Sequence, residues 1–373
     1  MTASDGAAAG KRRPGGDLAV LLVRPLATGG LAAHVDHELR LLRAAGLTVH
    51  ESTVQIPARP HPVTDLRSMR TLRGEARAHR PDAVHAHGLR AGALAALALL
   101  GRGRLVVTLH NRTLGSRGVR LIGRALLRII ARRADTILCV SPDLLEDARA
   151  AGAADVRHAV VPAPGRSVAG EGDANPAAGA LPASEETPVL PEADPARLDV
   201  LVLARLAPQK GLDTLLDAAG LLTSGKAGGT VRIRIAGEGP LRAPLESRIR
   251  QERLPVELLG HRSDVPALLA AADLVVSAAV WEGQPVALQE ALRAGRAIVA
   301  TDAGGTRWVT GDAAQLVPVG DAAALAAAVQ RHRDPRVRHA AEQASRLRAA
   351  QLPTEQDLKR QLVDVLAGVD RPG

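Results

Sequence analysis

Short apolar runs alternate with longer helical patterns along most of the chain, and this alternation restricts the fold more than any other feature. Residues 18–23, Leu-Ala-Val-Leu-Leu-Val, form a continuous apolar run that is typical of a strand buried on both faces. A helical pattern follows from Leu31 to Ala45 and ends at Gly46. Strand–helix units of this length predict parallel sheets covered by helices on both faces, so the predicted fold class is α/β.

The alternation occurs in two series, which predict two domains. In the first series we expect further strands at 47–53, 82–86, 104–109, 135–140 and 156–161, and further helices at 64–79, 89–100, 119–133 and 142–151. In the second series we expect strands at 199–204, 231–236, 256–259, 273–277, 297–301 and 315–317, and helices at 211–222, 241–252, 264–271, 285–294 and 321–332. Two doubly wound domains of this kind would face a cleft, which is the natural ligand site.

The segment between the two series has a different composition. Residues 166–198 are rich in Ala, Pro, Gly and Glu and indicate an interdomain linker. The linker separates a first domain at 17–165 from a second domain at 199–335. Residues 1–16 indicate a disordered tail that lacks the apolar core of a signal peptide. Residues 336–373 are helical and rich in Arg and Ala, with a return to the first domain as one option.

The chain is basic, and nearly all of its positive charge is arginine. The formal net charge is +9, and only four residues are lysine. A basic balance is compatible with nucleic acids, anionic membranes and phosphorylated ligands. Grooves that bind nucleic acid without sequence preference usually carry stacking aromatic side chains, whereas this chain has two Trp and no Phe or Tyr. We therefore expect no nucleic-acid partner.

Motifs for common cofactors are absent or incomplete. No Gly-x-Gly-x-x-Gly follows the first strand of either domain, which argues against a dinucleotide cofactor. Gly220–Lys226 matches most of a phosphate-binding loop, but it follows a helix and is succeeded by Ala227, where a magnesium-binding Ser or Thr is required. Cys139 lies alone in an apolar run and indicates a buried side chain. No apolar run is long enough to span a bilayer, so the expected location is the cytoplasm.

Residues 281–295 indicate a loop that runs into a short helix. Pro285 suits the first helical position, and Gly295 suits the residue just after the end. The unpaired N–H groups and the positive dipole end of such a helix favour an anion such as a phosphate. Glu282 in the loop and Glu290 about one turn into the helix could accept hydrogen bonds from sugar hydroxyls. The alternative is an ordinary capped surface helix with two solvated glutamates.

Two cations follow the first strand of the second domain. Arg205 offers a forked guanidinium and Lys210 a point charge, at the carboxyl edge where open α/β sheets bind ligands. The pair suits a diphosphate, and a solvated basic loop is the alternative. Gly237 belongs to a tight turn at the same edge, where we also expect Arg262. Residues 302–306 form a further glycine-containing turn.

Histidines follow two strands of the first domain. His85 and His87 end one strand and share a face, and His110 ends the next strand. A zinc site is conceivable, but the chain has one Cys and the sequence shows no clear carboxylate partner. We favour hydrogen-bond donors that line the cleft and assign no metal site. At the start of the first helix, Gly29 and Gly30 allow close approach of the backbone.

One predicted helix combines an arginine stripe with an apolar face. Within residues 117–133 the arginines at i, i+4 spacing are Arg120, Arg124, Arg128 and Arg132. The apolar side chains are Leu121, Ile122, Leu126, Ile129 and Ile130. Such a helix can lie on an anionic membrane surface. A helix that packs on the core with a solvated arginine stripe is the favoured alternative.

Taken together, these motifs resemble the family 4 retaining glycosyltransferases of the GT-B fold over residues 18 to 335. The matching motifs are Gly29-Gly30, His-Ala-His-Gly at 85–88, Thr-Leu-His at 108–110, Ala-Asp to Val-Ser at 134–141, Arg-Leu-x-x-x-Lys-Gly at 205–211, Gly-Glu-Gly-Pro at 237–240, and Glu282-x7-Glu290. Each motif is short, and their order and spacing make the match specific. The resemblance implies two Rossmann-like domains, the first on the acceptor side and the second binding the sugar donor.

The resemblance also implies roles for individual residues around a nucleotide-sugar donor of the UDP- or GDP-hexose type. Arg205 and Lys210 would hold the diphosphate. Glu290 would bind the ribose and Glu282 the sugar hydroxyls, while His110 would approach the sugar from the first domain. The implied donor-binding set is Gly30, Arg205, Lys210, Gly237, Arg262, Glu282, Gly283, Gln284, Val286 and Glu290, and the implied catalytic set is Glu282, His110, Arg205 and Lys210. Cationic side chains and a helix dipole would replace a metal cofactor, and transfer would retain the anomeric configuration by front-face attack.

Some features depart from the family pattern and leave alternatives open. Gln284 stands where many relatives have Phe or Leu, and Pro162 leads to Ala163-Pro164 where relatives have Asn-Gly. The acceptor is unknown, with lipid-linked or cell-envelope molecules as options, and peripheral contact with the inner face of the plasma membrane through 117–133 is a further option. The alternatives are an NDP-sugar epimerase, a sugar phosphorylase, or a non-catalytic relative that binds a glycan or nucleotide.

Overall fold

The chain divides into two compact units. Unit 1 comprises Met1–Leu138, Ala148–Arg157 and Lys359–Gly373, and unit 2 comprises Cys139–Asp147 and His158–Leu358. The computed structural model describes residues 18–26, 30–56, 61–99, 103–113, 115–163, 197–224 and 230–369. The predictions for the tail 1–16, for Gly29, for most of the linker 166–198 and for Gly225 and Lys226 lie outside the described residues.

Unit 1 is built on a six-stranded sheet with the spatial order β2-β1-β3-β4-β5-β6. Its strands are β1 (Ala19–Val23), β2 (Thr48–Glu51), β3 (Ala83–His87), β4 (Arg104–Leu109), β5 (Thr136–Cys139) and β6 (Val156–His158). β1 pairs in parallel with β2 and with β3, and β3 pairs in parallel with β4. The last four residues of β1 are buried, as its continuous apolar run predicts. The strand order reverses between β1 and β3, which is where open α/β sheets bind ligands.

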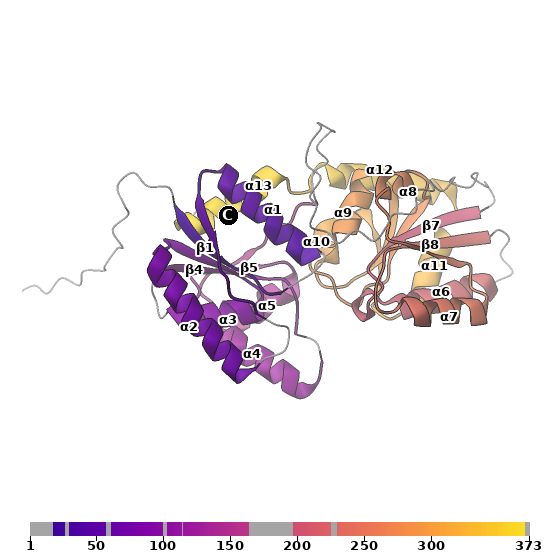
Figure 1. The fold of residues 1–373 in the computed structure, drawn as a ribbon. Helices are drawn as coiled ribbons and strands as arrows, with labels where there is room; N and C mark the ends of the chain where they lie inside the picture. Colours follow the sequence, from indigo (N-terminus) through magenta and orange to yellow (C-terminus); the bar gives the residue numbers. More distant parts are fainter. Residues whose placement is uncertain are drawn as a thin grey trace, which may run out of the picture. The chain divides into compact units, whose positions relative to one another are not determined.

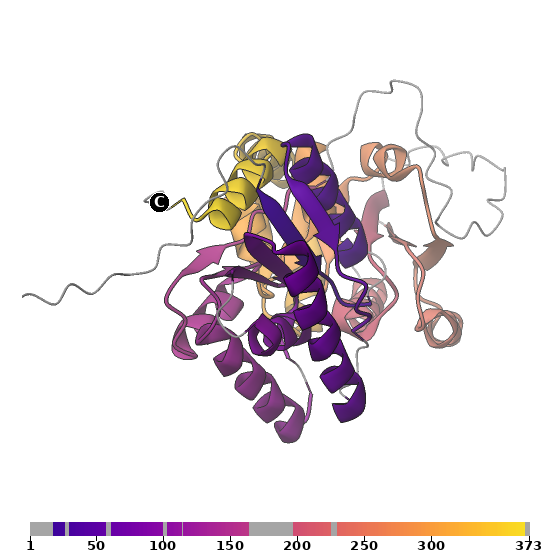
Figure 2. The same ribbon diagram turned by 60° about the vertical axis from the view of Figure 1, so that its left-hand side comes forward.

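Helices cover both faces of this sheet (Figures 1 and 2). They are α1 (Gly30–Ala44), α2 (Pro62–His79), α3 (Leu89–Leu99) and α4 (Arg117–Ala131), together with the last residues of α5 (Pro142–Ala150), which begins in unit 2, and the part of α13 (Glu355–Ala367) from Lys359 onward. α2, α3 and α4 lie on one side in both views, and α1 and α13 lie on the other. The chain returns to unit 1 at Lys359, and the Arg104 guanidinium at the start of β4 donates a hydrogen bond to the carbonyl of Val365 on α13. The last described helix, α13, therefore packs beside the sheet of unit 1.

The first turns of α4 expose apolar side chains, which corrects the favoured prediction for this helix. Leu121 is 65% exposed and Ile122 is 53% exposed, whereas Ile130 at the other end is fully buried. The arginines Arg120, Arg124, Arg128 and Arg132 are exposed, as predicted. The buried residues of the helix are Gly123, Leu127, Ile130 and Ala131, so it packs on the core mainly through its second half, and its first turns present apolar and cationic side chains together.

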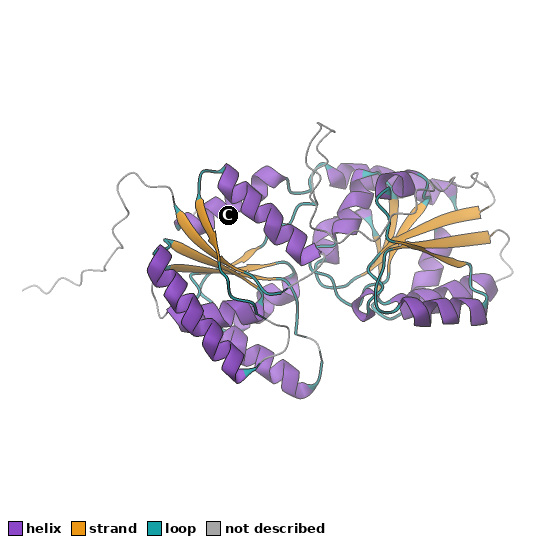
Figure 3. Cartoon of the chain, viewed as in Figure 1, coloured by secondary structure: helices purple, strands orange, loops and turns teal. Residues whose placement is uncertain are grey.

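Unit 2 repeats the architecture with the strand order β12-β11-β10-β7-β8-β9 (Figure 3). Its strands are β7 (Arg197–Leu203), β8 (Thr230–Ala236), β9 (Val256–Gly260), β10 (Leu274–Ser277), β11 (Ala297–Thr301) and β12 (Gln315–Val317). Neighbouring strands pair in parallel throughout. The order reverses between β7 and β10, so the loops after these two strands lie at the expected ligand-binding edge.

Side-chain alternation along β7 divides the core of unit 2 into two layers. The helices are α6 (Leu212–Ser224), α7 (Arg242–Glu252), α8 (Val265–Ala270), α9 (Val286–Arg293), α10 (Thr306–Thr310), α11 (Ala322–Arg331) and α12 (Pro335–Ala349), with short 3₁₀ turns η1 (Pro208–Lys210) and η2 (Gly311–Ala313). Val200 and Val202 pack with residues of α6, α7 and α11. Leu201 points to the other face and packs with residues of α8 and α9. A period-2 strand with both faces apolar thus accounts for helices on both sides.

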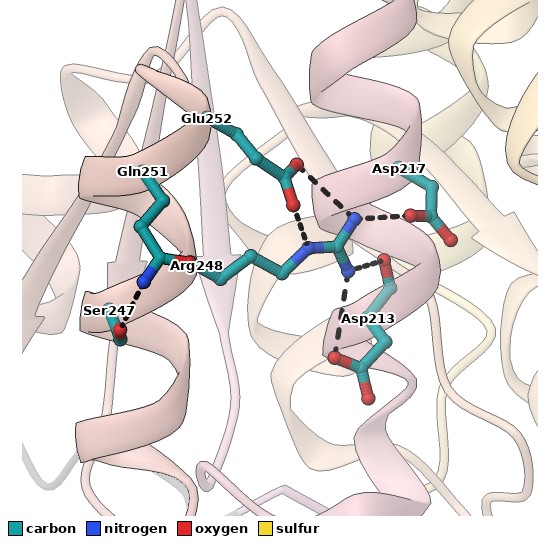
Figure 4. A network of polar contacts seen from close by, with 6 residues as sticks. All are labelled: Asp213, Asp217, Ser247, Arg248, Gln251 and Glu252. Carbon is teal, nitrogen blue, oxygen red and sulfur yellow. Dashed lines mark hydrogen bonds and ion pairs between the residues drawn. The ribbon is translucent and has the colours of Figure 1, made fainter.

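A charged network joins α6 to α7 at the surface of unit 2 (Figure 4). The Arg248 guanidinium on α7 forms an ion pair with Asp217 on α6 and bonds the main-chain oxygen of Asp213, one turn earlier, at 3.3 Å. On its own helix it pairs with Glu252, with 2.8 Å between Nε and Oε1. Hydrogen bonds to these carboxylates raise the pKa of Arg248. The network fixes the packing of the two helices on one face of the sheet.

One local prediction in unit 2 needs correction. Pro285 is the N-cap of α9 and not its first helical residue, with extended backbone at φ −67° and ψ 102°. The turn predicted at 302–306 is present at Gly304 and Gly305, and its last residue, Thr306, begins the helix α10. Gly295 follows the C-cap with φ +63°, as its predicted place after the helix requires.

Candidate functional site

Glycines allow the loops after β7, β8 and β10 to touch through their backbones. A Cβ on Gly211, which has φ +60°, would lie 1.9 Å from the carbonyl oxygen of Ala278 after β10. A Cβ on Gly237 after β8 would lie 2.0 Å from the carbonyl oxygen of Ala204 after β7. Both distances are far below van der Waals contact, so these positions require glycine. The predicted tight turn at Gly237 therefore serves to join two loops.

The loop after β11 is joined to the loop after β10 in the same way. A Cβ on Gly304 would lie 2.1 Å from the carbonyl oxygen of Glu282, and one on Gly305 would lie 1.8 Å from that of Gly283. The Gly305 N–H donates to the Glu282 carbonyl oxygen at 2.9 Å. Because β8, β7, β10 and β11 are consecutive in the sheet, the four loops form one continuous platform at its carboxyl edge.

Lys210 and Glu282 form an ion pair at the centre of this platform. Lys210 ends the 3₁₀ turn η1 after β7, and Glu282 lies in the loop before α9. Their side chains are 22% and 15% exposed. Both residues line a small cavity together with Val202, Ser277, Pro285 and Leu288. The structure thus brings together a cation and a carboxylate that the sequence identified separately.

Arg205 and Arg262, the other two cations predicted at this edge, differ in whether their side chains have a partner within the protein. Arg205 is exposed, and its side chain makes no hydrogen bond or ion pair with another described residue. Arg262 follows β9 and is paired with Asp264 in its own loop, with Nε 2.7 Å from Oδ1. The hydrogen bond from Arg262 lowers the pKa of Asp264 and raises that of Arg262. Arg205 is therefore available to an anion, whereas Arg262 is already neutralised by a neighbour.

The start of α9 places its first backbone N–H groups beside the ion pair. Gly283, Gln284 and Val286 are half-buried, and Glu290 is half-buried in the second turn of the helix. The side-chain amide nitrogen of Gln284 donates to the Ala159 carbonyl oxygen and lies 2.9 Å from His158 Nε2. The side chain of Gln284 is thus used within the protein, so its predicted contact with a donor rests on its backbone.

Two residues that position this site could not be predicted from the sequence. Gln289 on α9 is fully buried, accepts a hydrogen bond from the Ala163 N–H and donates one to the Val161 carbonyl oxygen, both at 2.8 Å. The Trp281 indole N–H donates to Asp143 Oδ2 at 2.8 Å. A Gln inside an amphipathic helix and a Trp in a loop carry no local signal of such long-range partners.

In unit 1, β3, β4 and α1 bring four histidines and one glutamate together. Glu38 on α1 lies 2% exposed and 2.7 Å from His34 Nε2. His85 and His87 are fully buried, and His87 Nδ1 lies 3.0 Å from His110 Nε2. The positions of the three histidines at strand ends were predicted from the sequence, whereas the role of Glu38 was not. The structure therefore supplies the carboxylate partner that we considered absent.

Burial and mutual repulsion disfavour protonation of the strand-end imidazoles. Burial lowers the pKa of His85 and of His87, and it lowers the pKa of His110 to about 3. Burial opposes ionisation of Glu38, but the imidazoles of His87 and His34 outweigh it and hold the pKa of that carboxyl well below its usual range. Burial lowers the pKa of His34, but the charge of Glu38 outweighs this and leaves it raised. The cluster is thus an anionic carboxylate among imidazoles.

Two family models match the two halves of the chain. The model "Glycosyl transferases group 1" matches residues 197–333, and the model "Glycosyl transferase 4-like domain" matches residues 6–164. The chain belongs to the group 1 glycosyltransferases. The family predicted from the short motifs is confirmed.

Curated relatives match over shorter stretches. The GDP-mannose-dependent alpha-(1-6)-phosphatidylinositol dimannoside mannosyltransferase of Mycobacterium tuberculosis is 36% identical over 124 residues, 32% of each chain. The amylovoran biosynthesis glycosyltransferase AmsK of Erwinia amylovora is 32% identical over 146 residues, 36% of this chain and 35% of its own. The chain thus spans about a third of the length of the curated relatives it matches.

Solved structures match over nearly the whole chain. Sucrose-phosphate synthase from Thermosynechococcus elongatus has a TM-score of 0.73 at 17% identity, covering 95% of this chain and 99% of that chain. Anabaena Alr3699/HepE, solved in complex with UDP, has a TM-score of 0.69 at 18% identity, covering 94% of this chain and 100% of that chain. These similarities confirm the predicted GT-B fold class. Among the described residues, no helix is both long and apolar enough to cross a membrane.

Proposed function

We propose that this chain transfers a hexose from a nucleoside diphosphate sugar to an acceptor with retention of the anomeric configuration. The observation that carries the proposal is the Lys210–Glu282 pair, which lies at the switch point between β7 and β10 beside the first amides of α9. A cation and unpaired backbone N–H groups suit a diphosphate, and a carboxylate suits sugar hydroxyls. The site therefore offers positive groups to the diphosphate of the donor and a hydrogen-bond acceptor to its sugar.

Binding of the donor would exchange partners within this pair. The diphosphate takes Lys210 away from Glu282, and Arg205 closes on the same anion from its exposed position. Glu282 is then free to accept from the sugar hydroxyls, and Glu290 on α9 accepts from the ribose. Because negative charge grows on the departing diphosphate, the two cations and the helix dipole stabilise the transition state more than the bound donor. We propose that no metal ion is needed on the diphosphate.

We propose that Gly30 and His110 are the residues of unit 1 that take part in binding the donor. His110 is neutral and bonded to His87, so one ring nitrogen is already engaged and the ring is held in one orientation. A neutral imidazole can donate or accept a hydrogen bond at the sugar without adding charge. The departing phosphate oxygen, on the same face as the incoming hydroxyl, is the base that this retaining mechanism requires.

For the acceptor, we propose a lipid-linked or cell-envelope molecule at the inner face of the plasma membrane. The relatives named above are a phosphatidylinositol dimannoside mannosyltransferase and an amylovoran biosynthesis enzyme. Leu121 and Ile122 on α4 expose apolar surface beside exposed arginines, a combination that suits an anionic membrane. Replacing both with Ser should reduce binding to vesicles that contain anionic lipid and leave nucleotide binding unchanged.

The donor is identified first by thermal shift. The full chain is melted with UDP, GDP, ADP and their hexose conjugates, with and without magnesium. A ligand that binds only the native state raises the melting temperature, so we expect a rise with one nucleotide that does not depend on magnesium. No rise with any nucleotide, in a protein that melts cooperatively, would favour a non-catalytic relative.

The Lys210→Ala variant tests the role of the diphosphate cation. We expect sugar transfer to fall by at least about 100-fold, because the leaving group loses its stabilising charge. The fold should be intact, because Lys210 is half-buried at a loop. Lys359→Ala, at a lysine on α13, is the matched control and should retain transfer. Wild-type turnover in Lys210→Ala would remove the basis of the proposal.

A further inference from the structure

Three buried polar atoms in unit 1 face one another without a hydrogen-bond partner. They are Glu38 Oε2 on α1 and His85 Nδ1 and His87 Nε2 on β3. Glu38 Oε2 lies 3.3 Å from His87 Nε2 and 3.6 Å from His85 Nδ1. The three side chains each offer a ligand atom, and these atoms lie within 4.8 Å of one another. Orphaned polar atoms are costly in a protein interior, so three at one point indicate a missing common partner.

The second polar atom of each of these side chains is already engaged. Glu38 Oε1 lies 2.7 Å from His34 Nε2. His85 Nε2 lies 2.8 Å from Thr108 Oγ1, and His87 Nδ1 lies 3.0 Å from His110 Nε2. These outer contacts fix the orientation of the carboxylate and of both rings. Metal-binding imidazoles and carboxylates are held in this way in known sites, where the outer partner sets the tautomer that leaves the other nitrogen bare.

We propose that Glu38, His85 and His87 bind one divalent transition-metal ion, for which zinc is the probe. Two imidazole nitrogens and one carboxylate oxygen form a ligand set that zinc and ferrous iron use in proteins. In a tetrahedral zinc site with bonds of about 2.05 Å, two ligand atoms lie about 3.3 Å apart. The observed separations of 3.3 and 3.6 Å agree with this spacing.

A proton shared between Glu38 and the histidines is the competing occupant. A charge-assisted N–H···O bond is about 2.7–2.9 Å long, which is shorter than both separations from Glu38 Oε2. The bond to His34, at 2.7 Å, shows that the same carboxylate makes a short contact where a proton is shared. The wider spacing at its other oxygen therefore fits a metal ion better than a proton.

The metal would act as a positioning element and not on the diphosphate of the donor. It would join α1 to β3 at the switch point of the first sheet and fix the ring of His87, whose other nitrogen bonds His110. The proposed metal site is independent of the proposed transfer reaction, because metal binding requires no nucleotide or sugar.

The test measures metal retention by the full wild-type chain. The protein is unfolded in chelator, refolded with Zn²⁺, Co²⁺ or Mg²⁺, and desalted, because a buried site fills most readily during folding. We expect about one Zn²⁺ or Co²⁺ per chain and no Mg²⁺, visible Co²⁺ absorption bands typical of a low coordination number, and a higher melting temperature with Zn²⁺. Metal content of the chain purified from zinc-supplemented cells provides a second measurement. A folded chain that retains neither ion in either preparation would overturn the proposal.

Variants assign the ligands. Glu38→Gln keeps the shape of the side chain and removes its charge, and we expect zinc affinity to fall by at least about 100-fold. Thr108→Val removes the outer partner of His85, and we expect a loss of about 10-fold. His79→Gln is the control, because His79 ends α2 and stacks on His50, which is not one of the cluster residues, so zinc affinity should not change. Unchanged zinc affinity in Glu38→Gln would overturn the ligand assignment.

Discussion

The carboxyl edges of the two sheets use the same topology in opposite ways. In unit 2, Gly211, Gly237 and Gly305 bring four loops into backbone contact, and the half-buried pair of Lys210 and Glu282 supplies the charged side chains that line the cavity. In unit 1, the side chains of Glu38, His85 and His87 are buried behind the edge. A strand-order reversal thus provides a place for a ligand, and the residues after the strands decide whether that place stays open or is filled.

The largest expected difference between the edges concerns their glycines. Gly211→Ala should lower the free energy of unfolding by about 3 kcal/mol and abolish nucleotide binding, since the new Cβ would lie 1.9 Å from a carbonyl oxygen. Gly88→Ala, after β3, should cost about 1 kcal/mol, because φ is +88° but no atom lies within 4 Å of the new Cβ. Chemical denaturation measures both. Equal costs would show that backbone contact does not distinguish the edges.

The next effect concerns the support behind the open edge. Gln289→Ala should cost about 2 kcal/mol, because it leaves the Ala163 N–H and the Val161 carbonyl oxygen buried without their partner. Gln284→Ala is the comparison, since its amide is less buried, and it should cost about 1 kcal/mol or less. Denaturant midpoints of the two variants provide the measurement. A smaller cost at Gln289 would contradict the role assigned to it.

A smaller effect on stability should accompany a large effect on activity at Glu282. Glu282→Gln removes one partner of a half-buried ion pair and should cost about 1 kcal/mol of stability, while transfer falls by about 100-fold. Melting curves and initial rates with the identified donor separate the two quantities. A large loss of stability together with the loss of activity would show that Glu282 has a structural role, and this would contradict the distinction between the two edges.

The smallest expected effect is a pH dependence of unit 2 that does not involve its edge. His332 is buried, and burial lowers its pKa below 6.5. The unfolded chain then binds the proton first, so His332 reduces stability as pH falls below 6.5 and has no such effect above it. The stability of His332→Gln, measured by denaturation at neutral and mildly acidic pH, should change less than that of the wild type. A steeper pH dependence in the variant would contradict the direction of the shift.

The sequence predicted the elements well because apolar periodicity reflects burial directly. The continuous runs of β1 and β7 and the glycine after α9 are local signals, and the structure has these elements within a few residues of the predicted bounds. Lys210 and Glu282 were identified one by one, since each follows a strand end. Their pairing was not predicted, because it depends on how two loops meet.

Each of the missed residues has at least one partner that is distant in the sequence. Glu38 lies in a polar stretch of α1 that indicates a solvated face, and its burial follows only from the packing of α1 against β3. Gln289 is similar, because its partners lie 126 and 128 residues away. The exposed first half of α4 was mispredicted for the same reason, since an amphipathic pattern does not say how much of a helix is covered.

The return of α13 to unit 1 has a consequence for the order of events during synthesis. The Arg104 side chain in β4 bonds a carbonyl on α13, so a residue made early has a partner that leaves the ribosome only after all of unit 2. Unit 2 can complete its core while it emerges, because most of it is one continuous segment. Unit 1 begins first and is completed last, which exposes its unfinished surface to chaperones for the whole time that unit 2 is being translated.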